Sequence, residues 1–213
     1  MDKIELIKQA IFKANISESD LPKSQFNVTA LTSLKIRHLL NNLGKLGTKY
    51  LECGVHKGGT FTATVADNSN LKEIYAVDSF ESDNTNADLA KPVFIQNADL
   101  FIPQTAKYEL FISDTFQLDL SLLPNGIDHY LYDGGHSQEE QRKALTYYYP
   151  ILADEFIFMC DDYDWEDVQK GTQQGIKDCN LEILFETHLV SEGSHDNDSW
   201  WNGFYVSLLK KNK

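Results

Sequence analysis

The chain has 213 residues, of which 42% are hydrophobic and 12% aromatic, and its formal net charge is −13. This composition is typical of a globular protein, and the length suits one domain with a full core. Nucleic-acid binding needs a basic face, so the charge argues against a nucleic-acid partner and equally against an anionic membrane surface. A small-molecule substrate is the expected partner.

The cysteines and the N-terminus bear on location. Cys53, Cys160 and Cys179 show no C-x-x-C spacing, and the first two lie in apolar, strand-like runs. We therefore expect buried free thiols, which suit a reducing cytoplasm. The start lacks the apolar segment of a signal peptide, and no run is long enough to span a membrane, so the sequence predicts a cytoplasmic protein.

The first 48 residues read as helical. Apolar residues recur at helical spacing over 2–14, a polar connection follows over 15–23, and a second helix is expected over 33–43, capped by Thr32 or Ser33. We expect residues 1–48 to form an N-terminal helical extension of a core over 49–213, within a single domain. The extension could cover a substrate, make a contact in a homo-oligomer, or simply pack on the core.

From residue 49 the pattern alternates between strands and helices, which predicts an α/β fold with a mostly parallel sheet. Strands are expected at 50–54, 73–78, 108–113, 127–132 and 155–160, with two further β-type runs at 181–190 and 203–209. Helices are expected from residue 60, over 93–101, over 137–149 and over 165–179, with polar loops at 81–88 and 191–202.

The most informative stretch is Tyr50 to Thr60, in which a strand containing Glu52 turns on glycines into a helix. Glycines let a backbone approach a ligand closely, and a helix N-terminus offers free N–H groups to it, so the stretch is typical of a nucleotide-binding βαβ unit. The spacing is not the G-x-G-x-x-G of nicotinamide enzymes. A plain tight turn is the alternative interpretation.

Acids follow strand after strand. Each predicted parallel strand from the second onward is followed closely by one or two of Asp78, Asp114, Asp133, Asp161 and Asp162. Ligands bind at the carboxyl ends of such strands. If the strand order is 3-2-1-4-5, Asp133, Asp161 and Asp162 converge, and their charges would repel unless protonated or bridged by a hard cation such as Mg²⁺. The alternative is that acids end strands merely because they are polar.

The glycine stretch resembles motif I of the class I S-adenosylmethionine-dependent methyltransferases. That resemblance implies a Rossmann-like fold with a seven-stranded, mostly parallel sheet flanked by helices. It also implies that Asp78 binds the ribose of S-adenosylmethionine. The other donor-binding residues implied are Glu52, Gly54, Gly58, Thr60, Asp114 and Thr115.

Two further motifs, 131–137 (Leu-Tyr-Asp-Gly-Gly-His-Ser) and 160–163 (Cys-Asp-Asp-Tyr), resemble the signatures of the macrocin-type sugar O-methyltransferases. By this resemblance Asp133, Asp161 and Asp162 bind a divalent metal ion, as similar acids do in the catechol O-methyltransferase group. Some sugar methyltransferases carry an acid, proposed as the base, where this chain has Gly135. This leaves His136 or a metal-bound water as the proton acceptor, and Asp133 and His136 are the predicted catalytic residues.

A bound metal would lower the pKa of a substrate hydroxyl and direct it at the methyl group. The sequence therefore predicts an O-methyltransferase that uses S-adenosylmethionine and a divalent metal on a hydroxyl of a sugar or secondary metabolite. A nicotinamide-dependent oxidoreductase and a non-catalytic nucleotide-binding partner domain are the alternatives. His136 could also be an ordinary surface histidine at a helix start.

Overall fold

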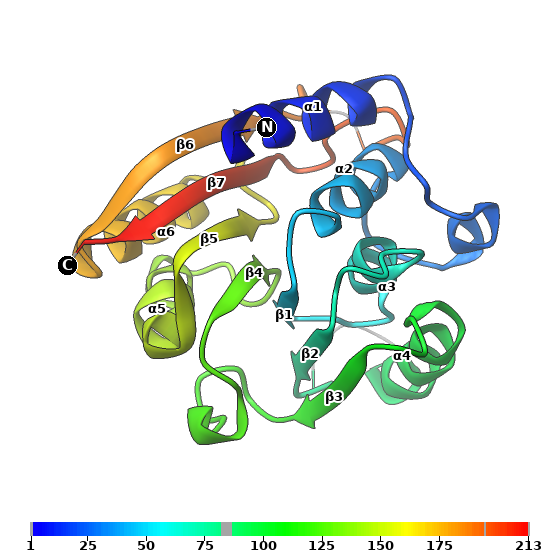
Figure 1. The fold of residues 1–213 in the computed structure, drawn as a ribbon, viewed down its shortest axis with the longest axis horizontal. Coiled ribbons are helices and arrows are strands. Elements are labelled where there is room, and N and C mark those ends of the chain that lie inside the picture. The colour runs from blue at the N-terminus through cyan, green and yellow to red at the C-terminus, as the bar shows by residue number, and fades with distance from the viewer. Residues whose placement is uncertain (1, 82–86, 194, 213) are drawn as a thin grey trace.

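The computed structural model describes residues 2–81, 87–193 and 195–212. Within them, seven strands form one sheet in the order β3-β2-β1-β4-β5-β7-β6 (Figure 1). The strands are β1 (Lys49–Cys53), β2 (Glu73–Asp78), β3 (Lys107–Ile112), β4 (Ile127–Tyr132), β5 (Leu152–Cys160), β6 (Leu181–Leu189) and β7 (Phe204–Lys211). β1 to β5 are parallel and β7 is antiparallel to both of its neighbours. The predicted mostly parallel sheet and the order 3-2-1-4-5 are confirmed.

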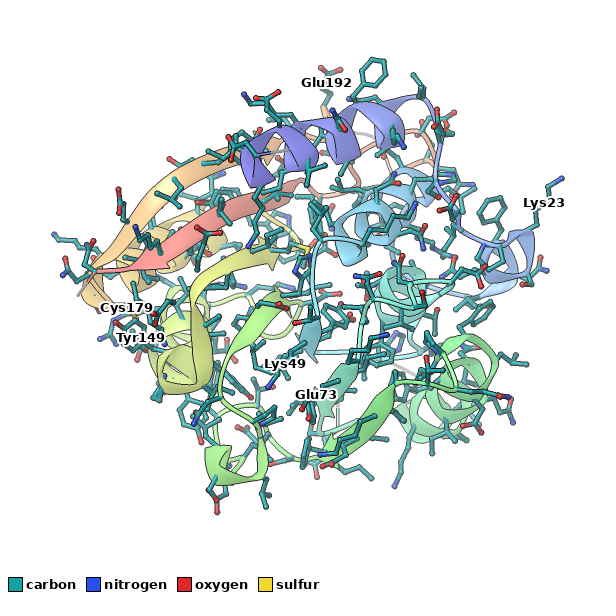
Figure 2. All side chains as sticks on the ribbon, viewed as in Figure 1. Lys23, Lys49, Glu73, Tyr149, Cys179 and Glu192 are labelled. Carbon is teal, nitrogen blue, oxygen red and sulfur yellow. The ribbon has the colours of Figure 1, made fainter. Side chains whose placement is uncertain are left out.

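The register of the parallel strands decides where their ends fall. Lys49 pairs with Glu73, which in turn pairs with Lys107, so β1, β2 and β3 start together. Lys49 and Glu73, labelled in Figure 2, also form a half-buried ion pair with an N–O distance of 3.1 Å. Because the strands start in register, the acids that follow them emerge together at the opposite edge of the sheet.

Helices cover both faces of the sheet (Figure 1). The α-helices are α1 (Lys3–Asn15), α2 (Leu34–Gly44), α3 (Gly59–Val65), α4 (Ala87–Phe101), α5 (Gln138–Tyr148) and α6 (Glu166–Asp178). Short 3₁₀ turns are η1 (Lys23–Asn27), η2 (Leu120–Leu122) and η3 (Tyr149–Ile151). One buried apolar cluster lies between α1 to α4 and the sheet, and a second lies between α5, α6 and the other face.

The two N-terminal helices are part of the main core. Ile7 of α1 and Leu39 of α2 are fully buried in the same cluster as Val206 of β7. Ser33, rather than Thr32, caps α2: its side-chain oxygen accepts a hydrogen bond from the backbone N–H of Ile36 at 3.1 Å.

The helices α4 and α6 each contain a residue that is unusual inside a helix, Pro92 and Gly171. The helix expected over 93–101 already begins at Ala87, although Pro92 lies inside it and lacks the N–H for one backbone hydrogen bond. Most of the loop expected over 81–88 lies outside the described residues. In α6, a Cβ added to Gly171 would lie 2.3 Å from the Gln138 carbonyl oxygen, so this glycine lets α6 pack closely on α5.

Cys53 and Cys160 are buried and, like Cys179, are free thiols, which confirms the expectation for the first two. None of the helices in the described part of the chain has the length and apolar character needed to cross a membrane.

Candidate functional site

A cavity of about 500 Å³ opens at the carboxyl ends of the parallel strands. Its lining comes from the turn after β1, the end of β2 and the residues after it, α4, the turns after β3, β4 and β5, the first turn of α5, and the N-terminal segment. The lining residues are Leu31, Gly54, His56, Asp78, Ser79, Phe80, Glu81, Ala90, Thr115, Asp133, Gly134, Gly135, His136, Glu140 and Asp162. The site therefore lies where ligands bind in open parallel sheets.

Gly54 brings the turn after β1 against the end of β4. Its φ is +88°, and a Cβ at this position would lie 1.9 Å from the carbonyl oxygen of Asp133. The Asp133 N–H donates to the Cys53 carbonyl at 2.8 Å, and the Gly54 N–H donates to the Val77 carbonyl at 2.9 Å. Only glycine fits both this conformation and this approach, so Gly54 fixes the floor of the cavity.

Asp78, at the end of β2, lines the cavity with its carboxylate already oriented. One oxygen accepts the backbone N–H of His56 at 2.8 Å, and the other accepts that of Phe80 at 2.6 Å. Each carboxylate oxygen has a second lone pair, so both remain able to accept hydrogen bonds from a ligand's hydroxyl groups.

Glu52 lies behind the glycine turn and not among the residues that line the cavity. It is fully buried, and its two oxygens accept the hydroxyls of Thr60, at 2.6 Å, and Tyr50. Burial raises the pKa of Glu52 to about 8, against the lowering effect of these two hydrogen bonds. Glu52 therefore supports the glycine turn through Thr60 and Tyr50.

The other predicted donor-binding residues fall in different places. Thr60 lines a small adjoining cavity of about 30 Å³, together with Thr32 and Asp133. Gly58, with φ +84°, ends the turn as the N-cap of α3. Thr115 lines the main cavity, whereas Asp114 is exposed and accepts the backbone N–H of Phe116 at 2.7 Å.

Three predicted site residues meet at the rim of the cavity. Ligand atoms of Asp133, His136 and Asp162 all lie within 4.8 Å of one another. The Nε2 atom of His136 is 2.7 Å from Oδ2 of Asp162, and the His136 ring meets the exposed Trp165 edge-on with 4.7 Å between centroids. Asp162 has φ +56°, a left-handed conformation that is uncommon for a residue other than glycine.

Asp161 lies outside this group of three but interacts electrostatically with Asp133 and Asp162. Its Oδ1 atom is buried and accepts no hydrogen bond from the residues that the structure describes. Burial, and then the charge of Asp162, raise the pKa of Asp161 well above its ordinary range. Burial, and then the charges of Asp161 and Asp162, do the same to Asp133.

This set of oxygen donors fits a hard divalent cation. Carboxylates crowded together bind a proton or a cation to offset their repulsion, and the buried Oδ1 of Asp161 receives no hydrogen bond within 2–81, 87–193 and 195–212. Asp133 and Asp162 would hold such an ion directly.

Three features of the site were not found from the sequence. Leu31, 70% exposed, reaches the cavity rim from the N-terminal segment, and Glu140 reaches it from the first turn of α5. Asn202, just before β7, donates to Oδ1 of Asp162 at 2.6 Å. Of these three residues, only Glu140 had a sequence signal, the Ser137–Glu140 capping box. That pattern predicted the start of α5, which the structure confirms, and gave no indication that Glu140 lies in the site.

Solved structures with the same fold include several methyltransferases. A putative O-methyltransferase from Klebsiella pneumoniae is 14% identical, with 98% of this chain and 90% of that chain covered and a TM-score of 0.56. The O-methyltransferase TomG from Streptomyces achromogenes, solved with SAM, is 13% identical, with 95% and 90% covered and a TM-score of 0.58. A putative RNA methyltransferase from Pyrococcus horikoshii is 13% identical, with 97% and 98% covered and a TM-score of 0.55.

No curated protein matches the sequence significantly. A family model described as a methyltransferase domain matches residues 51–163, which run from β1 through the glycine turn and the acids of β4 and β5. These residues are more than half of the chain and contain most of the cavity lining. The chain therefore belongs to this family of methyltransferase domains.

Proposed function

We propose that the protein is an S-adenosylmethionine-dependent O-methyltransferase that uses a divalent cation, most simply Mg²⁺, on a hydroxyl group of a small molecule. The observation that carries the proposal is the meeting of Asp133, His136 and Asp162 at the rim of a cavity that Gly54 and Asp78 also line. The family match favours methyl transfer over the nicotinamide alternative. Similar folds solved with SAM or SAH support the donor.

In the donor half of the cavity, Asp78 is the residue that would accept the ribose hydroxyls, and the Gly54 turn would admit the amino-acid part of the donor. Thr60 and Thr115 line the two cavities and would add polar contacts. Glu52 would act indirectly, by holding Thr60 and the turn in place. When bound, S-adenosylmethionine supplies an electrophilic methyl group and leaves as a neutral thioether, so no acid is needed for the leaving group.

At the rim, Asp133 and Asp162 would hold the cation, with Asp161 beside them. The cation supplies Lewis acidity that lowers the pKa of a hydroxyl. His136 would accept the proton: its Nε2 faces Asp162, which leaves Nδ1 as the nitrogen that can act as a base. An acceptor hydroxyl held between His136 and the donor would then face the methyl group in line.

The acceptor is proposed to be small, and a sugar or a secondary metabolite fits. The net charge of −13 disfavours RNA, although some similar folds belong to proteins described as RNA methyltransferases. The resemblance of 131–137 and 160–163 to the macrocin-type enzymes favours a sugar hydroxyl. Leu31 and Phe80 give the rim an apolar part that suits the carbon skeleton of such a molecule.

The test is a methyl-transfer assay with isotopically labelled S-adenosylmethionine, with Mg²⁺ or with chelator. The acceptor panel holds sugars, catechols and other hydroxyl compounds, together with amines and RNA. We expect transfer to an oxygen of at least one acceptor, and loss of that transfer with chelator. Transfer that chelator leaves intact would overturn the role of the cation. Transfer only to nitrogen or to RNA would overturn the acceptor class.

The role of His136 is tested in the same assay across pH. His136→Ala should lower turnover most at low pH, because hydroxide replaces the base as the pH rises. A loss of turnover that does not vary with pH, or no loss, would show that His136 is not the base.

A further inference from the structure

We call Asp133, Asp161 and Asp162 the acidic cluster. The side chain of Asn202, at the end of the polar loop over 195–202, contacts this cluster at Asp162. Its Nδ2 donates to Oδ1 of Asp162 at 2.6 Å, and its Oδ1 lies 2.6 Å from Nε2 of His195. A carboxylate can only accept, so the amide nitrogen must face Asp162 and the amide oxygen must face the N–H of His195. Both ends of the Asn202 amide are therefore satisfied in a single orientation.

The backbone supports the same contact. The Asp164 N–H donates to the Asn202 carbonyl at 2.8 Å, and the Tyr163 N–H donates to the Gly203 carbonyl at 3.0 Å. These bonds clamp the turn that follows β5, in which Asp162 adopts its left-handed conformation. The backbone thus sets where Asp162 stands, and the Asn202 side chain sets which way its carboxylate faces.

The far end of the loop is tied to the start of α2. The Ser33 hydroxyl donates to the Ser199 carbonyl at 2.7 Å, and the Lys35 N–H donates to the Asn197 carbonyl at 3.0 Å. The Lys35 ammonium also lies 5.2 Å from the centre of the Trp200 ring. The loop is therefore held at both ends, which gives Asn202 a fixed base from which to hold Asp162.

We propose that Asn202 is a positioning residue for the cation site: it occupies Oδ1 of Asp162 and so presents Oδ2 toward Asp133 and His136. This inference rests on the proposed function, because it assumes that the acidic cluster holds a cation. Partners that orient a metal ligand in this way commonly change metal affinity 10- to 100-fold when removed.

The experiment measures the affinity of the full chain for Mg²⁺ and for S-adenosylmethionine by calorimetry, in the original protein and in Asn202→Ala. Asn212→Ala is the matched control, since it removes an exposed amide whose Nδ2 donates to the Asn180 carbonyl at 2.9 Å, away from the cluster. We expect Asn202→Ala to weaken Mg²⁺ binding on the order of tenfold. Donor affinity should be unchanged, and Asn212→Ala should behave as the original protein does.

If the original protein binds Mg²⁺ and Asn202→Ala binds it equally well, the positioning role is overturned while the proposed function stands. If the original protein binds the donor but no Mg²⁺, the cation part of the proposed function fails. Hydrogen exchange over 195–203, without metal, then decides the role of Asn202. Faster exchange in Asn202→Ala and in Asp162→Ala, with no further increase in the double variant, would support the contact; unchanged exchange would overturn it.

Discussion

Glu52 is a fully buried carboxyl group whose pKa is raised to about 8 by desolvation, from an ordinary value of 4.5. At pH values between 4.5 and about 8, the folded chain holds a proton on Glu52 that the unfolded chain releases. This group therefore lowers the stability as the pH rises through that window, by about 1.4 kcal/mol per pH unit, and adds no further change above it.

Glu52→Gln should remove this contribution, because glutamine keeps the size of the side chain and an acceptor for the Thr60 hydroxyl. We expect the variant to gain stability relative to the original protein as the pH rises from about 4.5 to 8. Urea unfolding at a series of pH values measures this. Parallel curves for the two proteins would contradict the buried, protonated state of Glu52.

Asp162 gives the sharpest test of the cation site at the level of one residue. Asp162→Asn keeps the shape of the side chain but removes its charge, so saturable Mg²⁺ binding should be lost while donor binding is largely kept. Asp119→Asn is the matched control, because Asp119 is exposed and its Oδ1 accepts the N–H of Ser121 in a turn, which an asparagine oxygen can also do. If both variants bind Mg²⁺ as the original protein does, Asp162 is not a ligand of the cation.

At the scale of the elements, the strand–turn–helix unit of β1 and α3 depends on Gly54. Gly126 has a similar positive φ, +81°, but a Cβ there meets nothing within 4 Å. Gly126→Ala should therefore cost only the strain of the left-handed backbone, roughly 1–2 kcal/mol. Gly54→Ala adds a collision with the Asp133 carbonyl and should cost more.

The same pair of variants separates stability from function. Donor affinity should fall in Gly54→Ala and stay normal in Gly126→Ala when both are measured below their unfolding temperatures. Equal losses of stability in thermal melts, or normal donor affinity in Gly54→Ala, would show that the close approach of β1 and β4 does not shape the cavity.

The elements that the sequence predicts well are those with a local signal. The parallel strands have apolar runs that end in acids, and the strand order then brings Asp133 and Asp162 together. Ser137 and Glu140 predict the start of α5 through their capping pattern. Each of these features depends on residues a few positions apart or on a regular topology.

The features that the sequence does not predict depend on contacts between distant segments. Asn202 meets Asp162 across 40 positions, and Leu31 reaches the cavity from a segment before β1. The role of Glu52 could not be predicted either, since only the packed structure shows that Tyr50 and Thr60 use both of its oxygens. Glycine has a low helix propensity, and the reason for Gly171 within α6 is visible only in the structure, because its packing partner, Gln138, lies on another helix.

For the whole molecule, the sheet gathers its acids at one edge and the N-terminal helices complete one of its two cores. The segment that joins these helices places Leu31 at the cavity rim, and the loop before β7 places Asn202 on the acidic cluster. The N-terminal region and the C-terminal hairpin thus both contribute to a site whose floor is built by β1, β2 and β4.

We propose that this cavity binds a methyl donor through Asp78. The most direct measurement is a calorimetric titration of the chelator-treated protein with S-adenosylmethionine and with S-adenosylhomocysteine, repeated on Asp78→Ala. We expect saturable binding of both ligands at one site per chain, and its loss in Asp78→Ala. No saturable binding to the original protein, or equal affinity in the variant, would contradict the account.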